Sequence, residues 1–481
     1  MNISPNTESK MKAVLVNPPA IMGMDFIREG RCMQSSNSWA TPWPPITLAI
    51  MASIAESYME VHLFDFIIEK TDREAARKIV TELEPDLLVI NTGFPSIDGD
   101  MEFATDLKRS MPDCFILSFG VFFTLLKEEG LEYCHSVDMA IYGEPELTFE
   151  KFVREFSLTG EVPITDGLLI RDGERVVSTP ARSLIQDLDQ LPYPNRALLN
   201  NELYVLPSNG KRFTLINSAR GCPFKCVFCI APVYYGKRVR RHSIAYIIQE
   251  IVTCMNVHGI ESFLFWEESF TSDKSFCIEL CKEIIRLNLN IEWAATTRAA
   301  SLDNEILSYM KQAGCMLLGL GIETSNQIIL NRARKSESVE EINRAVSLCR
   351  DAKIPAMGHF IFGLPGETPS TAQQTIEYAM HLGLDYVQAY CAVPYPGTEL
   401  GDLAKSSGWI EATGWSQYDF GGRSIMRIGS IKPEEVNRAR QKLLRKFYTR
   451  PSYIIARIIE IRSLKRLLNI SSFVKWIIGS R

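Results

Sequence analysis

The alternation of strand-like and helix-like segments constrains the fold of this chain more than any other feature. Short apolar runs, many of them rich in Val, Ile, Leu and Phe, are each followed by a longer stretch in which apolar residues recur at helical spacing. Strands joined through helices pair in parallel, because a parallel pair needs a long crossover connection. The sequence therefore predicts an α/β protein, and it contains two successive series of such units.

The first series predicts a doubly wound, Rossmann-like domain over residues 10–155. Strands are expected at residues 12–16, 61–64, 87–90, 115–119 and 139–141. Helices are expected at residues 46–57, 72–84 and 100–109. Residues 156–210 contain two Asp-Gly pairs and a Leu-Pro-Tyr-Pro passage. Such turn-rich sequence predicts a connector between domains.

The second series predicts a partial (β/α)6 barrel of TIM type over residues 211–405. Its strands are expected at residues 213–218, 262–266, 291–296, 316–321, 356–362 and 386–392. In barrels of this type the chemistry takes place at the carboxyl ends of the strands. Residues 406–481 lose the alternation and predict a helical, basic C-terminal region.

Size and charge limit the classes of function. At 481 residues the chain exceeds the length at which one hydrophobic core stops growing, and 46% of its residues are hydrophobic. A net charge of -5 gives no general attraction to nucleic acid. Residues 1–12 are polar, and no apolar run is long enough to cross a bilayer. We therefore expect a cytoplasmic protein that does not bind nucleic acid.

Three cysteines stand together on the loop that follows the first barrel strand. Cys222, Cys226 and Cys229 lie within eight residues on a loop marked by Gly and Pro. Thiolates are the ligands that iron–sulfur clusters prefer, and three of them leave one iron of a 4Fe-4S cluster open for a substrate. Zinc is the competing interpretation, but structural zinc sites have four ligands, and His242 has no partner at finger spacing.

The Cys-x3-Cys-x2-Cys spacing, with Phe228 before the last cysteine, resembles the signature of the radical S-adenosylmethionine (SAM) superfamily. Further motifs follow in that superfamily's order, at residues 265–268, 297–299, 321–324, 363–367 and 394–398. The resemblance implies that SAM chelates the open iron. It also implies that an electron from the cluster cleaves SAM to methionine and a 5′-deoxyadenosyl radical, and that a reducing partner such as flavodoxin or ferredoxin supplies the electron.

Charged residues at the ends of the barrel strands are candidates for SAM binding. Glu267 is placed to accept a hydrogen bond from the SAM ammonium group, and Arg298 to pair with the SAM carboxylate. Glu323 is placed for the ribose hydroxyls or the methionyl group. Related families often have two aspartates where this chain has Glu267 and Glu268, which leaves both carboxylates as alternatives.

Two further residues are candidates for contact with the nucleoside of SAM. Gly363 permits close approach of the backbone, although a structural turn explains this glycine equally well. Phe228 is placed to cover the adenine ring, and its alternative is a simple core position.

A doubly wound domain before such a barrel resembles the cobalamin-binding domain of cobalamin-dependent radical SAM enzymes. The supporting residues are Thr92, Gly93, Gly120, Gly143 and Glu144, which follow three predicted strands at the edge where open α/β sheets bind ligands. Small residues there would admit the nucleotide tail of cobalamin.

The loop after the first strand departs from the methionine-synthase-like version of that domain. That version has an Asp-x-His-x-x-Gly motif, whose histidine ligates cobalt, where this chain has Asn17-Pro18-Pro19. The resemblance therefore implies cobalamin whose cobalt has no histidine ligand on its lower face.

The resemblance leads to a hypothesis with three alternatives. The leading hypothesis is a cobalamin-dependent methyltransferase that acts on an unactivated carbon. The first alternative is an oxidative or ring-forming cyclase that resembles the anaerobic magnesium-protoporphyrin ester cyclases. The second is a methylthiotransferase, in which Cys32, Cys114 and Cys134 would hold a second cluster. The third is a sensor that binds cobalamin or a cluster and performs no chemistry.

The C-terminal residues combine basic and apolar side chains. Residues 438–481 contain twelve Lys and Arg against one acid, Glu460. Such a mixture predicts either peripheral contact with an anionic membrane or a solvated helix packed on the barrel. Membrane contact would suit a small-molecule substrate of lipid, isoprenoid or porphyrin-like type.

Overall fold

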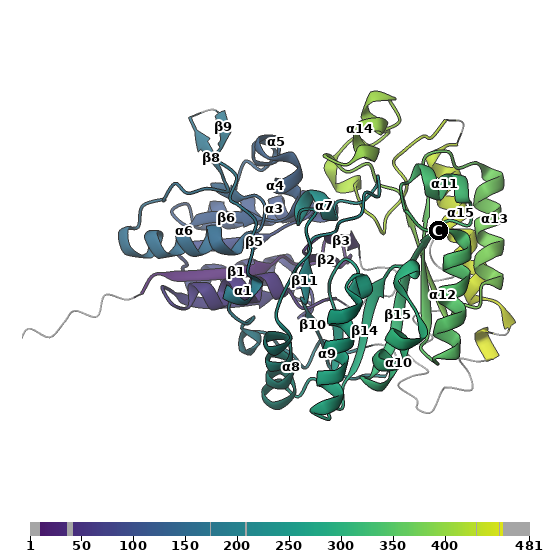
Figure 1. Cartoon of the computed structure of the whole chain (residues 1–481). Coiled ribbons are helices and arrows are strands. Elements are labelled where there is room, and N and C mark those ends of the chain that lie inside the picture. Colours follow the sequence, from purple (N-terminus) through teal and green to yellow (C-terminus); the bar gives the residue numbers. More distant parts are fainter. Residues whose placement is uncertain are drawn as a thin grey trace, which may run out of the picture. The chain divides into compact units, whose positions relative to one another are not determined.

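The structure of the chain is a computed structural model, which describes residues 10–35, 42–173, 175–206, 209–429, 431–451 and 453–455. It divides into two compact units. Unit 1 comprises residues 1–32, 44–185 and 190–200, and unit 2 comprises residues 33–43, 186–189 and 201–481. Figure 1 draws most of unit 1 in purple to blue and most of unit 2 in teal to yellow.

Unit 1 contains a seven-stranded sheet in the order β4-β1-β5-β6-β7-β8-β9. The strands are β1 (Lys12–Asn17), β4 (Glu60–Asp65), β5 (Leu87–Asn91), β6 (Phe115–Phe119), β7 (Met139–Ile141), β8 (Leu168–Asp172) and β9 (Arg175–Ser178). The first five pair in parallel. Taken in chain order their arrangement is 2-1-3-4-5, a doubly wound order in which the switch point lies between β1 and β5.

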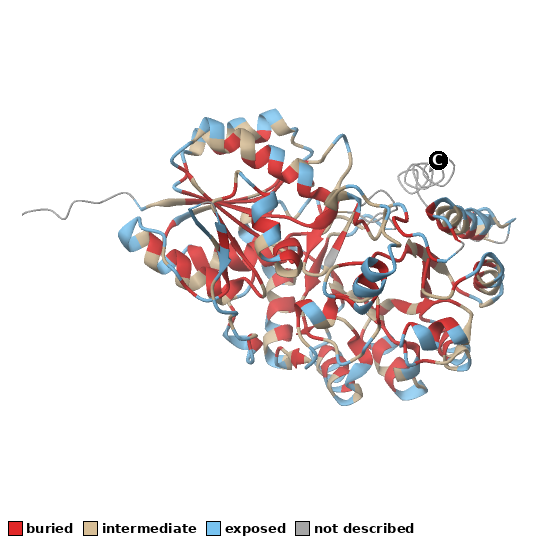
Figure 2. Ribbon diagram, turned by 90° about the horizontal axis from the view of Figure 1, so that it is seen from above, coloured by how far each residue is buried: buried red, intermediate tan, exposed pale blue. Residues whose placement is uncertain are grey.

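Helices cover both faces of this sheet, as the burial pattern in Figure 2 shows. They are α1 (Ile46–Ala55), α2 (Arg73–Leu83), α3 (Ile97–Ser110), α4 (Val121–Leu126), α5 (Glu128–Tyr133) and α6 (Glu146–Thr159). α1 packs beside α6, and α2 packs beside α3. α1 is buried at nine of its ten residues, because its sequence, Ile-Thr-Leu-Ala-Ile-Met-Ala-Ser-Ile-Ala, is apolar on almost every side.

The passage expected to be a connector contributes to the sheet of unit 1. β8 pairs antiparallel with β7, and β9 pairs antiparallel with β8, so the sheet continues past residue 155. Asp172 is the last residue of β8 and pairs with Arg175, so the Asp172-Gly173 pair marks this hairpin and not a connector. The two strands are short and partly exposed, and for this reason their apolar pattern is weak in the sequence.

Unit 2 contains a sheet of six parallel strands in the order β10-β13-β14-β15-β16-β17. The strands are β10 (Phe213–Ile216), β13 (Ser262–Phe265), β14 (Glu292–Thr297), β15 (Cys315–Glu323), β16 (Ala356–Phe362) and β17 (Tyr386–Cys391). These are the six strands that the sequence predicts, in the same order. The predicted α/β class with parallel sheets is therefore confirmed.

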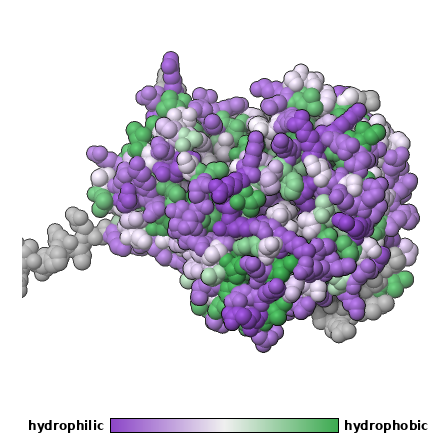
Figure 3. Space-filling view, in the orientation of Figure 1, coloured by the Kyte–Doolittle hydropathy of each residue, from purple (hydrophilic) through white to green (hydrophobic). Residues whose placement is uncertain are grey.

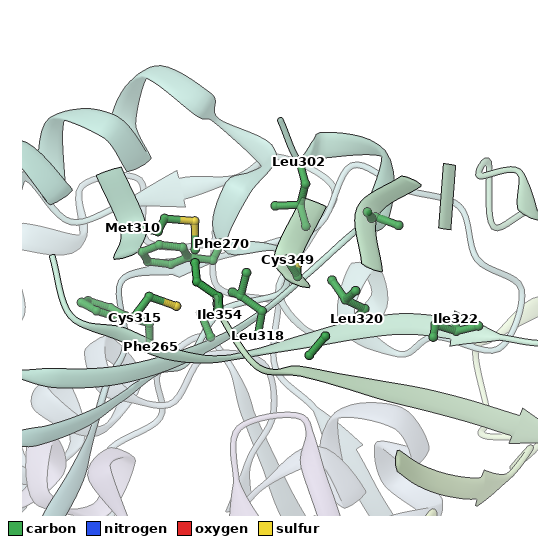
Figure 4. Packing of buried hydrophobic residues seen from close by; sticks show 14 of the residues in the cluster. Phe265, Phe270, Leu302, Met310, Cys315, Leu318, Leu320, Ile322, Cys349 and Ile354 are labelled. Carbon is green, nitrogen blue, oxygen red and sulfur yellow. The ribbon is translucent and has the colours of Figure 1, made fainter. Parts of the chain in front are cut away.

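Helices pack against one face of this sheet and share a single core with it. They are α8 (Ile244–His258), α9 (Lys274–Arg286), α10 (Asn304–Gln312), α12 (Val339–Asp351), α13 (Pro369–His381) and α15 (Pro433–Tyr448). Figure 4 shows residues of this core, among them Phe265, Met310, Leu318 and Cys349, between the strands and the helices. Alternate residues of β15 (Leu318, Leu320 and Ile322) enter the core, as the two-residue period of a strand requires.

Polar residues at strand-to-helix junctions fix where these helices begin. Ser243, Asp273, Asp303, Ser338, Thr368 and Thr398 each accept a backbone N–H from the first turn of the helix that follows. The remaining elements of unit 2 are β3 (Cys32–Ser35), β11 (Ala219–Arg220), β12 (Arg240–Arg241), α7 (Ala231–Tyr234), α11 (Gln327–Arg332) and α14 (Glu399–Ser406), and β2 (Phe26–Glu29) belongs to unit 1.

The first part of the basic C-terminal region forms a helix that packs on the last strand. The Tyr448 hydroxyl of α15 donates to the carbonyl of Val387 on β17 at 2.7 Å and accepts its N–H at 3.1 Å. The predicted membrane contact depends mainly on residues 456–481, which lie outside the described residues. Among the described residues no helix is long and apolar enough to cross a membrane. The face seen in Figure 3 mixes hydrophilic and hydrophobic residues.

Candidate active site

A short antiparallel pair of strands encloses the three-cysteine loop after β10. β11 and β12 pair antiparallel, and the N–H of Cys222 donates to the carbonyl of Gly236 at 3.0 Å. Gly221, directly before Cys222, has a φ of +99°, and a Cβ there would lie 2.1 Å from the carbonyl oxygen of Arg238. Only glycine fits this position without a backbone shift.

The far side of the loop is fixed by backbone contacts from another part of the barrel. The N–H of Val227 donates to the carbonyl of Ala333, directly after α11, at 3.1 Å. The carbonyl of Val227 accepts the N–H of Leu400 at 2.9 Å. The loop is thus anchored on both sides at the carboxyl end of the strands, where the sequence predicts it.

Cys222, Cys226 and Cys229 are all partly buried and free of disulfides. Burial raises the pKa of the Cys226 thiol, and the nearby cations Lys335 and Arg298 lower it. Among the described residues, no three His, Cys, Asp or Glu side chains are gathered as ligands of a single metal ion. A cubane cluster needs a wider arrangement, because each of its three thiolates binds a different iron. The donor set fits a 4Fe-4S cluster.

Glu267 is a buried carboxylate that already has partners. It accepts the Ser218 hydroxyl at 2.6 Å, and both of its oxygens lie 2.9 Å from Nη1 of Arg241. Glu267 and Glu268 both line a small hollow beside Cys222 and Ser269. The structure therefore brings both carboxylate residues to the cluster loop, and it commits Glu267 to an ion pair with Arg241.

Arg298 lies against the cysteine loop itself. Its guanidinium stacks 3.8 Å from the ring centroid of Phe224, and Nη1 is 4.0 Å from the sulfur of Cys226. Nη2 donates to the carbonyls of Lys335 and Ser336 and lies 3.4 Å from Glu337. The structure holds Arg298 beside a cluster ligand, and its pairing with the SAM carboxylate stays a prediction.

Glu323 forms a buried ion pair that the sequence did not reveal. The ammonium of Lys335 donates to the Glu323 carboxylate at 2.7 Å, and each side chain is only 7% exposed. Burial lowers the pKa of Lys335. The negative charges of Glu323 and Glu337 raise it by more, so the pKa of Lys335 lies above its usual range. A Cβ at Gly321 would lie 2.6 Å from Nζ of Lys335, so that glycine makes room for the ammonium.

Gly363 and Phe228 have different surroundings. Gly363 has a φ of +85°, its N–H donates to Glu367 at 2.6 Å, and an added Cβ would lie 3.2 Å from Val436 on α15. This close approach supports the structural-turn alternative for Gly363. Phe228 is partly buried on the cysteine loop, next to the cluster ligand Cys229.

Four residues of this site escaped the sequence analysis. Ser218, Arg241, Lys335 and Glu337 provide the partners of the predicted charged residues. Two of them had a signal in the sequence that could have identified them. Ser218 follows the first barrel strand, and Lys335 follows helix α11. Ion pairs between residues 12 to 39 positions apart cannot be read from sequence spacing.

At the switch point of unit 1, a buried polar network occupies the carboxyl ends of β1 and β5. Arg28 donates to Asp100 at 2.6 Å and to the side chain of Asn17 at 3.0 Å. Thr92 and Ser96 each donate to the same carboxylate of Asp100 at 2.6 Å. The side chains of Asn17 and Thr92 thus have partners within unit 1.

The other candidates for cobalamin binding follow β5, β6 and β7. A Cβ at Gly120 would lie 2.0 Å from the carbonyl oxygen of Thr92, so backbone packing already requires this glycine. Gly93 accepts the N–H of Ser96 through its carbonyl at 3.3 Å, and Glu144 accepts that of Ile185 at 2.8 Å. A Cβ at Gly143 would meet no atom within 4 Å, which leaves open space at the end of β7.

Neither of the two described cysteines proposed for a second cluster is suited to hold one. Cys114 and Cys134 are buried, and burial raises the pKa of the Cys114 thiol to about 12. Both belong to the apolar core, where packing alone explains them. The side chain of Cys32 lies outside the described residues.

Comparison with known proteins decides the family. Residues 216–379 match the family described as the Radical SAM superfamily. The chain belongs to the radical SAM superfamily. It is 30% identical over 450 residues to an uncharacterized methyltransferase of Pyrococcus horikoshii, an alignment that covers 94% of this chain and 95% of that protein.

Two further similarities concern named enzymes. The chain is 27% identical over 390 residues to the anaerobic magnesium-protoporphyrin IX monomethyl ester cyclase of Cereibacter sphaeroides, covering 79% of this chain and 63% of the cyclase. It shares its fold with the radical SAM methyltransferase TsrM from Kitasatospora setae, solved with cobalamin and a [4Fe-4S] cluster, at a TM-score of 0.68 and 18% identity. That match covers 92% of this chain and 90% of TsrM.

Proposed function

We propose that this radical SAM enzyme is a cobalamin-dependent methyltransferase that acts on an unactivated carbon of a lipid, isoprenoid or porphyrin-like substrate. One observation carries the proposal: a single chain combines a loop of three thiols at the carboxyl end of a barrel strand with a doubly wound parallel sheet. The 30% identity to a methyltransferase over nearly the whole chain supports it, as does the fold shared with TsrM.

The residues of unit 2 have distinct roles in this proposal. Cys222, Cys226 and Cys229 hold the cluster, and the carboxylates of Glu267 and Glu268, which lie beside Cys222, bind the ammonium end of SAM. The cluster supplies the electron that cleaves SAM, and cobalamin supplies the methyl-transfer chemistry. A small reducing protein such as a flavodoxin or ferredoxin provides the electron to the cluster.

Cobalamin binding is assigned to the carboxyl ends of the parallel strands of unit 1, where doubly wound sheets bind ligands. The open space at Gly143 supports this assignment. The end of β1 offers no imidazole, because His62 lies in the middle of β4 opposite Val14 and the loop itself is Asn17-Pro18-Pro19. Cobalt would therefore have no histidine ligand from this loop.

Product analysis tests methyl transfer without knowledge of the substrate. Removal of the methyl group from SAM releases S-adenosylhomocysteine, whereas radical cleavage releases 5′-deoxyadenosine. Reduced, reconstituted enzyme with SAM and cobalamin should form both products, and S-adenosylhomocysteine should disappear when cobalamin is omitted. Formation of S-adenosylhomocysteine at the same rate without cobalamin would contradict the proposal.

A cyclase is the second candidate, and the similarity to the Cereibacter sphaeroides enzyme favours it. A cyclase should form 5′-deoxyadenosine without S-adenosylhomocysteine. A sensor should form neither product.

A further inference from the structure

A buried cluster of charged side chains lies beside Cys226. It consists of Arg298, Glu323, Lys335 and Glu337, whose side chains are at most 8% exposed. Burying four charged groups costs free energy, because removal of each charge from water is unfavourable and ion pairing offsets this cost only in part.

Two carboxylates and two backbone carbonyls hold the two cations in place. Lys335 lies 2.7 Å from Glu323 and 3.5 Å from Glu337, and Arg298 lies 3.4 Å from Glu337. The other oxygen of Glu337 accepts the N–H of Ala300 at 2.9 Å. Arg298 also donates to two backbone carbonyls of the segment that carries Lys335.

The same segment touches the cysteine loop directly. The carbonyl of Ala333 accepts the N–H of Val227, and Arg298 bridges the loop through Phe224 and the sulfur of Cys226. Lys335 belongs to the same set of contacts, because it shares Glu337 with Arg298 and its backbone carbonyl accepts a hydrogen bond from Arg298. The four formal charges cancel, but the member with a printed contact to the sulfur of Cys226 is a cation, Arg298.

We propose that Lys335 and Arg298, held by Glu323 and Glu337, are positioning residues that raise the reduction potential of the cluster bound at Cys226. The proposal rests on the proposed function, because it presupposes that the three thiols hold a 4Fe-4S cluster. Reduction adds one electron, and so one negative charge, to the cluster. Buried cations stabilise the reduced form, and a low local dielectric strengthens their effect.

Opposite charge changes should move the midpoint potential in opposite directions. Lys335→Met should lower the ratio of reduced to oxidised cluster about tenfold at a fixed ambient potential, which is about 59 mV for a one-electron couple. Glu323→Gln removes a negative charge and should raise that ratio. Lys274→Met is the matched control, because Lys274 also pairs with two carboxylates but its side chain is 42% exposed, and its shift should be smaller.

The test is a redox titration of the reconstituted full-length chain, followed by the electron paramagnetic resonance signal of the reduced cluster in the absence of SAM. Omitting SAM removes any effect of Glu323 or Arg298 on substrate binding. If Lys335→Met does not take up iron, the charge-balanced double variant Lys335→Met/Glu323→Gln should do so and titrate near the wild type.

Unchanged midpoints in Lys335→Met and Glu323→Gln, or shifts of both in the same direction, would overturn the proposal when the variants hold the wild-type amount of iron. A wild-type protein that binds no cluster would instead contradict the proposed function. The two failures are therefore distinguishable from the iron content alone.

Discussion

The carboxyl group of Glu367 links the stability of the fold to pH. One oxygen accepts the N–H of Gly363 at 2.6 Å, and the other has no hydrogen-bond partner among the described residues. Burial raises the pKa of Glu367 from its ordinary 4.5 to about 7, although the hydrogen bond from Gly363 opposes this shift. Between these pH values the folded chain binds more protons at Glu367 than the unfolded chain.

Stability should therefore fall as the pH rises from about 4.5 to about 7 and should lose nothing more at Glu367 above that range. The loss amounts to about 3 kcal/mol, since each pKa unit corresponds to about 1.4 kcal/mol. Glu367→Gln keeps the acceptor for Gly363 and removes the titration. In urea denaturation at pH 5 and pH 8, this variant should lose less stability than the wild type. An equal loss of stability between pH 5 and pH 8 in the variant and the wild type would exclude Glu367 as the source of that loss.

At the scale of elements, the hairpin of β11 and β12 determines whether the three-cysteine loop can hold its cluster. Gly221→Ala would place a Cβ against the carbonyl of Arg238 at a positive φ, and this would displace the backbone next to Cys222. We expect lower iron content after anaerobic reconstitution, with unit 1 unaffected. Gly408→Ala is the matched control, because its φ of +64° is also positive and its Cβ would meet no atom within 4 Å. Wild-type iron content in Gly221→Ala would contradict this account of the hairpin.

A truncation that tests the predicted membrane contact must keep helix α15, because this helix is part of the core. Truncation near residue 430 would remove α15 and expose the core beside β17, because Leu443, Phe447 and Tyr448 are buried there. A chain that ends at Ile455 keeps α15 and still lacks Arg457, Arg462, Lys465, Arg466, Lys475 and Arg481.

This shorter chain should sediment less with anionic liposomes than the full chain, and the difference should shrink as salt is added. The reason is that the attraction between basic side chains and an anionic surface is screened by salt. Equal sedimentation of the two chains at low salt would favour a solvated or packed terminus over membrane contact.

At the scale of the whole molecule, the sequence predicted the elements better than their connections. The six barrel strands were predictable because each is a buried apolar run that ends in a distinctive motif. The β8–β9 hairpin was missed because short, partly exposed edge strands have little apolar pattern. In the site, the cysteine loop was readable from local spacing. The pairing of Glu323 with Lys335, and the position of Arg298 over Phe224, depend on segments that only the fold brings together.

Cys222, Cys226 and Cys229 are proposed to hold the cluster that cleaves SAM. The most direct measurement is 5′-deoxyadenosine formation by anaerobically reconstituted, reduced enzyme, with iron determined on the same samples. We predict about four irons per chain and continuous product formation for the wild type. The Cys222→Ala, Cys226→Ala, Cys229→Ala triple variant should lose both. Undiminished 5′-deoxyadenosine formation by the triple variant would contradict the assignment of the cluster to these three thiols.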